Sequence, residues 1–242
     1  MGVLNKDLRA KIIIKGRESG LVHYSSALSC VDFLQHLYFS RMQPEDIFIL
    51  SKGHAAMALY SVLEAKGYKP AWQMHPDFSP SQGIYATSGS LGHGLPIATG
   101  YALAKKLQDE KGRVYVLVGD GEISEGSNWE ALAIASRHNL NLTVAIDWNK
   151  HQIAGDPKEV LGITSGVLEK RLSAFGCKTL VIGGHETSEF RRIDSFGETG
   201  LQGIILDTIP GKGIKYLEMT QPHHFDWDKN SEEYLRALED LK

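Results

Sequence analysis

The apolar residues of this chain are gathered in short runs that alternate with stretches of helical spacing. Five runs rich in Val, Ile and Leu have the length of a strand and contain few polar positions, as is typical of strands buried on both faces of a sheet. They lie at 47–50, 113–119, 141–147, 178–182 and 203–209.

Between and around these runs, apolar residues recur every three to four positions, which predicts amphipathic helices. We expect Ser29 to be the N-cap of the second helix and Gly67 to end the third. Alternating strands and helices predict a three-layer α/β fold, with a central, mostly parallel sheet covered by helices on both faces. No repeat or linker-like stretch divides the sequence, so we expect residues 1–242 to form a single domain. The predicted helices lie at 7–19, 29–40, 53–68, 91–109 and 231–241.

Composition narrows the range of partners and compartments. The net charge of −3 gives no reason to expect nucleic acid or an anionic membrane surface as a partner. No apolar run approaches the roughly 18 residues of a membrane helix, and the N-terminus lacks the pattern of a signal peptide. Cys30 and Cys177 both lie among apolar residues. We therefore expect two buried free thiols and a cytoplasmic protein.

The stretch GDGEISEG at 119–126 follows one predicted strand, and Asn149 follows the next. Ligands of parallel sheets bind beyond the carboxyl ends of the strands, so Asp120 and Asn149 share a crevice if the two strands are neighbours. Their carboxylate and amide oxygens are hard ligands that suit Mg²⁺ or Ca²⁺. The glycines of the stretch would let a diphosphate approach the backbone, and the helix that follows could offer N–H groups to it.

Three other interpretations of the polar residues are open at this point. A nicotinamide dinucleotide site needs G-x-G-x-x-G, but the third glycine is misplaced here, and Asp120 and Glu122 would repel a bare pyrophosphate unless a metal ion intervened. The stretch could also be a turn without any ligand. The ten histidines raise the question of zinc, but they show no H-E-x-x-H pattern and have no cysteine nearby. We expect structural or solvent-facing roles for His36, His138 and His185.

Further motifs resemble those of a known family. GDG with a later Asn resembles the diphosphate–Mg²⁺ motif of thiamine diphosphate enzymes. Four more elements resemble transketolases, and together they cover nearly the whole chain. These elements are SKGH at 51–54, HPD at 75–77, TSGSLGHG at 87–94, and GKG at 211–213 followed by HH at 223–224. The resemblance implies the thiamine diphosphate-binding fold and the N-terminal subunit of a split transketolase.

The resemblance also implies a role for each matched residue. Asp120, Asn149 and the backbone carbonyl of His151 would bind Mg²⁺ or Ca²⁺. His54 and His224 would approach the diphosphate and the reacting centre, and His23 and His75 would contact substrate hydroxyls. The implied catalytic residues are thus His23, His54, His75 and His224, and Glu125 matches a glutamate of the family's dimer interface. The implied cofactor-binding residues are His54, Gly89, Leu91, Gly119, Asp120, Gly121, Glu122, Asn149, His151 and His224, with Gly89 and Leu91 against the aminopyrimidine ring.

The sequence departs from the family pattern at two places. Val22, Ser25 and Ser26 replace glycines around His23, so we expect a stiffer and bulkier loop there. His223 replaces the tryptophan that usually precedes the last histidine.

The resemblance implies the transfer of a two-carbon glycolaldehyde unit from a ketose, such as a sugar phosphate, to an aldehyde. It also implies a separate C-terminal subunit. That second chain would carry the pyrimidine-binding domain and the glutamate at N1′, in a heterotetramer with two copies of each chain. Three alternatives remain open: a transketolase-like enzyme of specialised metabolism with an unusual acceptor, the alpha subunit of a 2-oxo acid dehydrogenase, and a non-catalytic protein of the same fold.

Overall fold

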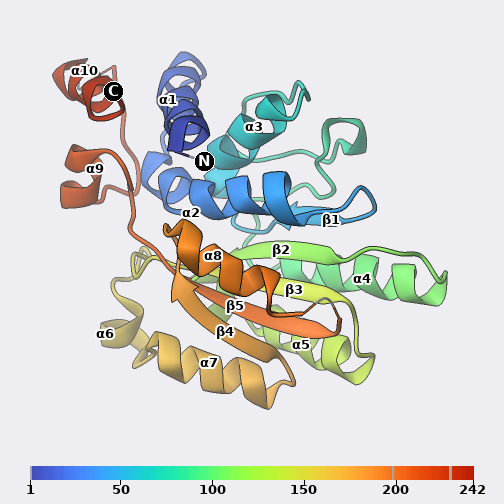
Figure 1. The fold of residues 1–242 in the computed structure, drawn as a ribbon. Coiled ribbons are helices and arrows are strands. Elements are labelled where there is room, and N and C mark those ends of the chain that lie inside the picture. Colours follow the sequence, from blue (N-terminus) through green and yellow to red (C-terminus); the bar gives the residue numbers. More distant parts are fainter. Residues whose placement is uncertain (1, 198, 229–230) are drawn as a thin grey trace.

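Five parallel strands form one sheet at the centre of the molecule, in the order β1-β2-β3-β5-β4 (Figure 1). A computed structural model describes residues 2–197, 199–228 and 231–242. All five predicted strands are confirmed, although β5 lies slightly closer to the N-terminus than expected. The strands are β1 (Ile47–Leu50), β2 (Val114–Gly119), β3 (Leu142–Trp148), β4 (Lys178–Gly183) and β5 (Leu201–Asp207).

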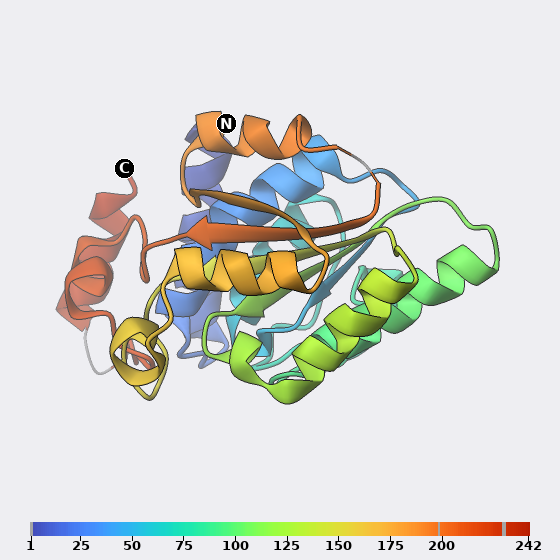
Figure 2. The same ribbon diagram turned by 90° about the horizontal axis from the view of Figure 1, so that it is seen from below.

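Helices cover both faces of the sheet, as predicted. α2 and α8 lie on one face, with α1 and α3 packed against α2, and α4, α5 and α7 lie on the other (Figures 1 and 2). α9 and α10 pack together beside α1. The helices are α1 (Gly2–Glu18), α2 (Tyr24–His36), α3 (Ala56–Ala65), α4 (Gly94–Leu107), α5 (Gly126–Arg137), α6 (Pro157–Leu161), α7 (Ser165–Ala174), α8 (Thr187–Asp194), α9 (Lys215–Thr220) and α10 (Ser231–Asp240).

The central strand β2 shows why the strand runs are apolar throughout. Successive side chains of a strand point to opposite faces. Tyr115 and Leu117 join the core beneath α2, and Val116 and Val118 join the core beneath α4 and α5. All six residues of β2 are buried because both faces are covered.

The predicted starts of four helices are wrong. α1 begins at Gly2 rather than at residue 7, and α3 begins at Ala56, after a 3₁₀ turn at Gly53–Ala55. α2 begins at Tyr24, and Ser29 lies inside it rather than at its N-cap. The Ser29 hydroxyl is buried and lies 2.6 Å from Oδ2 of Asp147 on β3, a distant partner that local spacing does not reveal. α4 begins at Gly94, because Gly92 adopts a left-handed φ of 84° in the loop before it. By contrast, Gly67 does end α3, with a φ of 94°.

Both cysteines are free and buried, as expected, and burial raises the pKa of each thiol to about 12. Within the described ranges, no helix combines the length and apolar character needed to cross a bilayer.

Candidate functional site

A cleft of about 410 Å³ opens at the carboxyl ends of β1, β2 and β3. Because β2 and β3 pair in parallel, with Gly119 opposite Asp147, the segments that follow them lie side by side. β2 and β3 are thus neighbours, which was the condition for Asp120 and Asn149 to share a crevice. The lining residues come from the segments after β1, β2, β3 and β5 and from the start of α2. They are His23, Ser25, Ser26, Lys52, His54, Gly89, Leu91, Gly119, Asp120, Gly121, Glu122, Asn149, His151, Gln152, Ile153, Ala154, Pro210, Pro222, His223 and His224.

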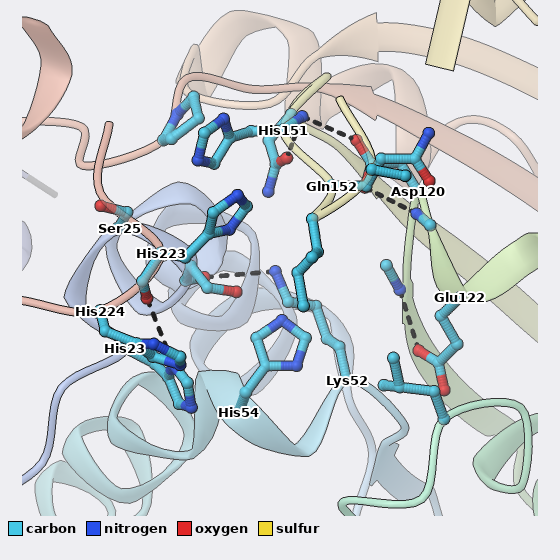
Figure 3. A pocket seen from close by; sticks show the side chains of 18 of the residues that line it. His23, Ser25, Lys52, His54, Asp120, Glu122, His151, Gln152, His223 and His224 are labelled. Carbon is cyan, nitrogen blue, oxygen red and sulfur yellow. Dashed lines mark hydrogen bonds between the residues drawn. The ribbon is translucent and has the colours of Figure 1, made fainter. Parts of the chain in front are cut away.

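Asp120 and Asn149 meet on one side of this cleft. The backbone N–H of His151 donates to Oδ2 of Asp120 at 3.2 Å and to Oδ1 of Asn149 at 2.9 Å (Figure 3). The two side-chain oxygens therefore lie within hydrogen-bond distance of the same N–H and are neighbours on the cleft wall. No three His, Cys, Asp or Glu side chains gather into a metal site within the described residues, so a cation here would need ligands of other kinds.

A buried ion pair fixes the orientation of Asn149. Its amide nitrogen donates to Oδ2 of Asp147 at 3.1 Å, which leaves the amide oxygen facing the cleft. Asp147 also pairs with Lys52, and both side chains are almost inaccessible to solvent. Burial is the largest single effect and would lower the pKa of Lys52 and raise that of Asp147, but the opposite charges nearby and the hydrogen bonds together leave the pKa of Lys52 raised and that of Asp147 lowered. Neither residue was predicted from the sequence.

The buried charge of Asp147 also affects the pKa of Asp120. Burial, followed by the repulsion of Asp147, raises the pKa of Asp120 to about 6. The charged lining consists of two carboxylates, Asp120 and Glu122, and one ammonium, Lys52. A diphosphate would therefore enter more favourably with a cation than alone.

Glu122 lines the cleft, but its carboxylate is engaged by the protein. Oε1 accepts hydrogen bonds from Ser51 Oγ at 2.5 Å and Gly92 N at 2.9 Å, and Oε2 accepts from Gly119 N at 3.0 Å. Burial raises its pKa, against the effect of these donors. Glu122 thus ties the end of β2 to the segments on either side of it.

Close backbone contacts explain the glycines of the SKGH and TSGSLGHG motifs. A Cβ at Gly53 would lie 2.7 Å from the nitrogen of Gly89, and one at Gly94 would lie 2.3 Å from Oγ of Ser51. Gly89 also has a φ of 129° and packs on the ring of His75. The two motifs are therefore locked together, and this places Gly89 and Leu91 on the cleft wall.

The structure brings the four predicted catalytic histidines together. The ring of His23 lies 4.6 Å from that of His224, 5.7 Å from that of His54 and 6.4 Å from that of His75. Figure 3 shows His23, His54 and His224 grouped on the side of the cleft away from Asp120. Four segments that are distant in sequence thus contribute to one cluster.

Two members of the cluster are held neutral. Burial, followed by the charge of Lys52, lowers the pKa of His54 to about 3. Burial also lowers the pKa of His23, whose Nδ1 lies 3.3 Å from the carbonyl of His223. Because a carbonyl can only accept, Nδ1 of His23 carries the proton, and Nε2 is left as a base.

His223, which departs from the family pattern, stacks on His151. The two rings lie 4.0 Å apart at an interplanar angle of 16°. Burial lowers the pKa of both imidazoles, and the charges of His151 and His224 lower that of His223 further. The stack joins the segment after β3 to the segment that carries His224.

Several polar atoms at the cleft fit a polar ligand. Among the described residues, the hydroxyls of Ser25 and Ser26, Nε2 of His151 and Nε2 of Gln152 are buried without a hydrogen-bond partner. Buried polar groups are rarely left unpaired in native proteins. Together with the paired oxygens of Asp120 and Asn149, these atoms suit a cofactor that carries phosphates and a cation.

The remaining predicted residues lie elsewhere. Gly126 begins α5 after a 3₁₀ turn, and it does not belong to the described lining of the cleft. Glu125, which precedes α5, is exposed beside Gly92. His138 is exposed, His36 is buried and His185 is partly buried; both of the latter are hydrogen-bonded on the far side of α2.

Comparison with known proteins gives consistent matches. The family model of the transketolase thiamine diphosphate-binding domain matches residues 32–195. One chain of the apulose-4-phosphate transketolase of Actinobacillus succinogenes, named as a subunit of that enzyme, is 36% identical and covers 98% of this chain and 94% of its own length. The 6-deoxy-6-sulfo-D-fructose transketolase subunit SqwG of a Clostridium species is also 36% identical, over 82% of this chain and 81% of its own length.

The fold is shared with solved structures. Transketolase from Leishmania mexicana superimposes with a TM-score of 0.81 at 20% sequence identity. The match covers 99% of this chain but only 40% of the longer protein.

Proposed function

The chain belongs to the transketolase family through its thiamine diphosphate-binding domain, and from this premise we propose that it is the diphosphate-binding subunit of a two-chain transketolase. Residues 1–242 act in this proposal as a single domain. The observation that carries the proposal is the cleft, in which the side-chain oxygens of Asp120 and Asn149 lie opposite a cluster of histidines.

On the cation side, Asp120, Asn149 and the backbone carbonyl of His151 would hold Mg²⁺. Mg²⁺ usually takes one or two carboxylates and completes its shell with phosphate oxygens and water. The convergence of Asp120 and Asn149 on one N–H supports this assignment. Asp147 would act as a positioning residue, because it binds the amide nitrogen of Asn149 and leaves the amide oxygen free to turn toward a cation.

On the substrate side, the histidines would bind the sugar and move its protons. Thiamine diphosphate, when bound, supplies the electron sink for breaking the C–C bond of the ketose. Nε2 of His23 can accept a proton from a substrate hydroxyl, since Nδ1 is turned toward the carbonyl of His223. The neutral His54 can exchange hydrogen bonds without adding charge beside the ammonium of Lys52.

The proposal includes a separate partner chain. Two relatives of nearly the same length are each named as one subunit of an apulose-4-phosphate transketolase, so their enzymes contain a second subunit. That second chain would supply the glutamate at N1′ of the pyrimidine ring and close the cleft, in a heterotetramer. The substrate would be a ketose with an anionic terminal group, because the relatives' names specify a phosphate in one enzyme and a sulfonate in another.

The test is Mg²⁺-dependent binding of thiamine diphosphate to the assembled complex, followed by calorimetry. Asp120→Ala should abolish this binding, because the cation loses a ligand and Glu122 remains to repel the diphosphate. Glu130→Ala, which removes an exposed acid on α5, is the matched control and should bind normally. Unchanged affinity in Asp120→Ala would refute the cation site.

A further inference from the structure

Asp32 on α2 is the centre of a buried polar cluster that the proposed chemistry does not use. Its side chain is 3% exposed, and Arg9 of α1 binds it through two hydrogen bonds of 2.9 and 2.6 Å. The amide of Asn5 also donates to it. His185, in the loop between β4 and α8, lies 2.7 Å from Oδ2. These contacts join three segments that are far apart in the sequence.

His185 connects this cluster to the segment after β5. The backbone N–H of Ile209 donates to Nε2 of His185 at 2.8 Å. Since Nε2 accepts, Nδ1 carries the proton and donates to Asp32. The imidazole is therefore a neutral bridge between a buried carboxylate and one backbone N–H.

Arg9 holds the same segment at its other end. Its Nε donates to the carbonyl of Lys212 at 2.9 Å. The side chain of Arg9 also packs against Gly213, where a Cβ would lie 2.6 Å from Nε. The GKG motif thus lies against an arginine that is itself fixed by Asp32.

Segment 209–213 forms part of the cleft wall on the histidine side. Pro210 lines the cleft, and the N–H of Gly211 donates to the carbonyl of Ser25 at 2.9 Å. Ser25 lies in the first turn of α2, directly after the loop that carries His23. Thr208, which precedes the segment, is bound separately to Asp147, so the cation side has its own anchor.

We propose that Asp32, Arg9 and His185 are positioning residues that hold segment 209–213 against the loop of His23 and thereby shape the substrate side of the cleft. The effect on substrate rests on the proposed function, whereas the effect on the segment does not. Loss of the bridge should loosen residues 209–213 and weaken substrate binding, while the cofactor keeps its ligands.

The experiment compares His185→Phe with His36→Phe in the full chain and in its complex with the partner chain. His36 is a suitable control because it lines the same small cavity of about 70 Å³, and its side chain is 4% exposed against 9% for His185. It bonds to Asp194 and stacks on Phe190, and no hydrogen bond from it to segment 209–213 occurs among the described residues. Each substitution removes the hydrogen bonds of one histidine and keeps an aromatic ring at that position.

Hydrogen exchange of the full chain is the first measurement. The amide of Ile209 should exchange about fivefold faster in His185→Phe, the factor that corresponds to one lost hydrogen bond, and should not change in His36→Phe. His185→Gln keeps one donor and one acceptor on a more flexible side chain, so it should give a smaller change of the same sign. Unchanged exchange in both His185 variants, or an equal change in His36→Phe, would overturn the proposal.

Kinetics of the complex are the second measurement. His185→Phe should raise KM for the donor ketose about fivefold and change kcat and thiamine diphosphate affinity less than twofold. Faster exchange without any change in KM would refute the role in substrate positioning. If the unmodified complex transfers no two-carbon unit, the proposed function fails, and the exchange result still decides whether the bridge holds the segment.

Discussion

His75 lies at the edge of the histidine cluster, against Gly89 and facing His23. It does not belong to the described lining that surrounds Asp120 and Asn149. His75→Ala should therefore lower kcat by about tenfold or more and leave thiamine diphosphate affinity nearly unchanged. His138→Ala, at an exposed histidine, is the control and should have no effect. A loss confined to cofactor binding would show that His75 acts on the cation side.

His54 should make stability depend on pH. Its pKa is lowered to about 3, below the usual value of about 6.5 in an unfolded chain. The unfolded state therefore binds the proton first, and the contribution of neutral His54 is present above pH 6.5 and is lost as the pH falls toward 3. When the pH falls from 7 to 5, the free energy of unfolding of the unmodified chain should decrease by up to about 2 kcal/mol more than that of His54→Phe, as measured by urea titration. Equal losses would contradict the assignment.

Among individual residues, the sequence predicted those that belong to recognisable motifs and missed those that hold the motif residues in place. The four histidines and the pair Asp120 and Asn149 were predicted because their spacing resembles a family, and the structure places them in and beside one cleft. Lys52 and Asp147 were missed, although an aspartate at the end of a buried strand is a signal that could have been used. The bridge of His185 to Ile209 depends on contacts between distant segments, which no local pattern encodes.

The packing of α4 against the segment after β1 depends on a glycine at its first residue. A Cβ at Gly94 would lie 2.3 to 2.6 Å from the side chain and Cα of Ser51. Gly94→Ala should reduce the free energy of unfolding by about 1 to 3 kcal/mol, because backbone atoms of a buried strand end would have to move.

Gly100 provides the matched control on the same helix. It is exposed, and no atom lies within 4 Å of a Cβ built there. Gly100→Ala should stabilise the protein by about 0.5 to 1 kcal/mol through helix propensity. If both substitutions shift urea unfolding in the same direction, close packing at Gly94 does not explain the motif.

The helices and strands could be predicted from the sequence because the apolar residues of each have a simple spacing. Strands buried on both faces are continuous apolar runs, and the five runs were all strands. Helix starts were less predictable. Ser29 has the chemistry of an N-cap, but its hydroxyl has a buried partner on β3, and this tertiary contact outweighs the local preference.

Considered as a whole, the molecule has a cleft with exposed apolar side chains at its rim. Ile153, which is 89% exposed, and Leu91, which is 42% exposed, both line it. Exposed apolar side chains around a polar cleft are typical of a surface that another chain covers. The cleft also lacks a group that could act as the glutamate at N1′ among its described lining, since Glu122 is bonded on both oxygens.

The central claim concerns assembly, because a water-excluding site protects the reaction from wasteful protonation. The direct measurement mixes this chain with the proposed C-terminal partner chain and follows glycolaldehyde transfer, with light scattering for the mass of the complex. The account predicts no transfer by this chain alone, and transfer by a complex with the mass of two copies of each chain. Full transfer activity from this chain as a monomer would contradict it.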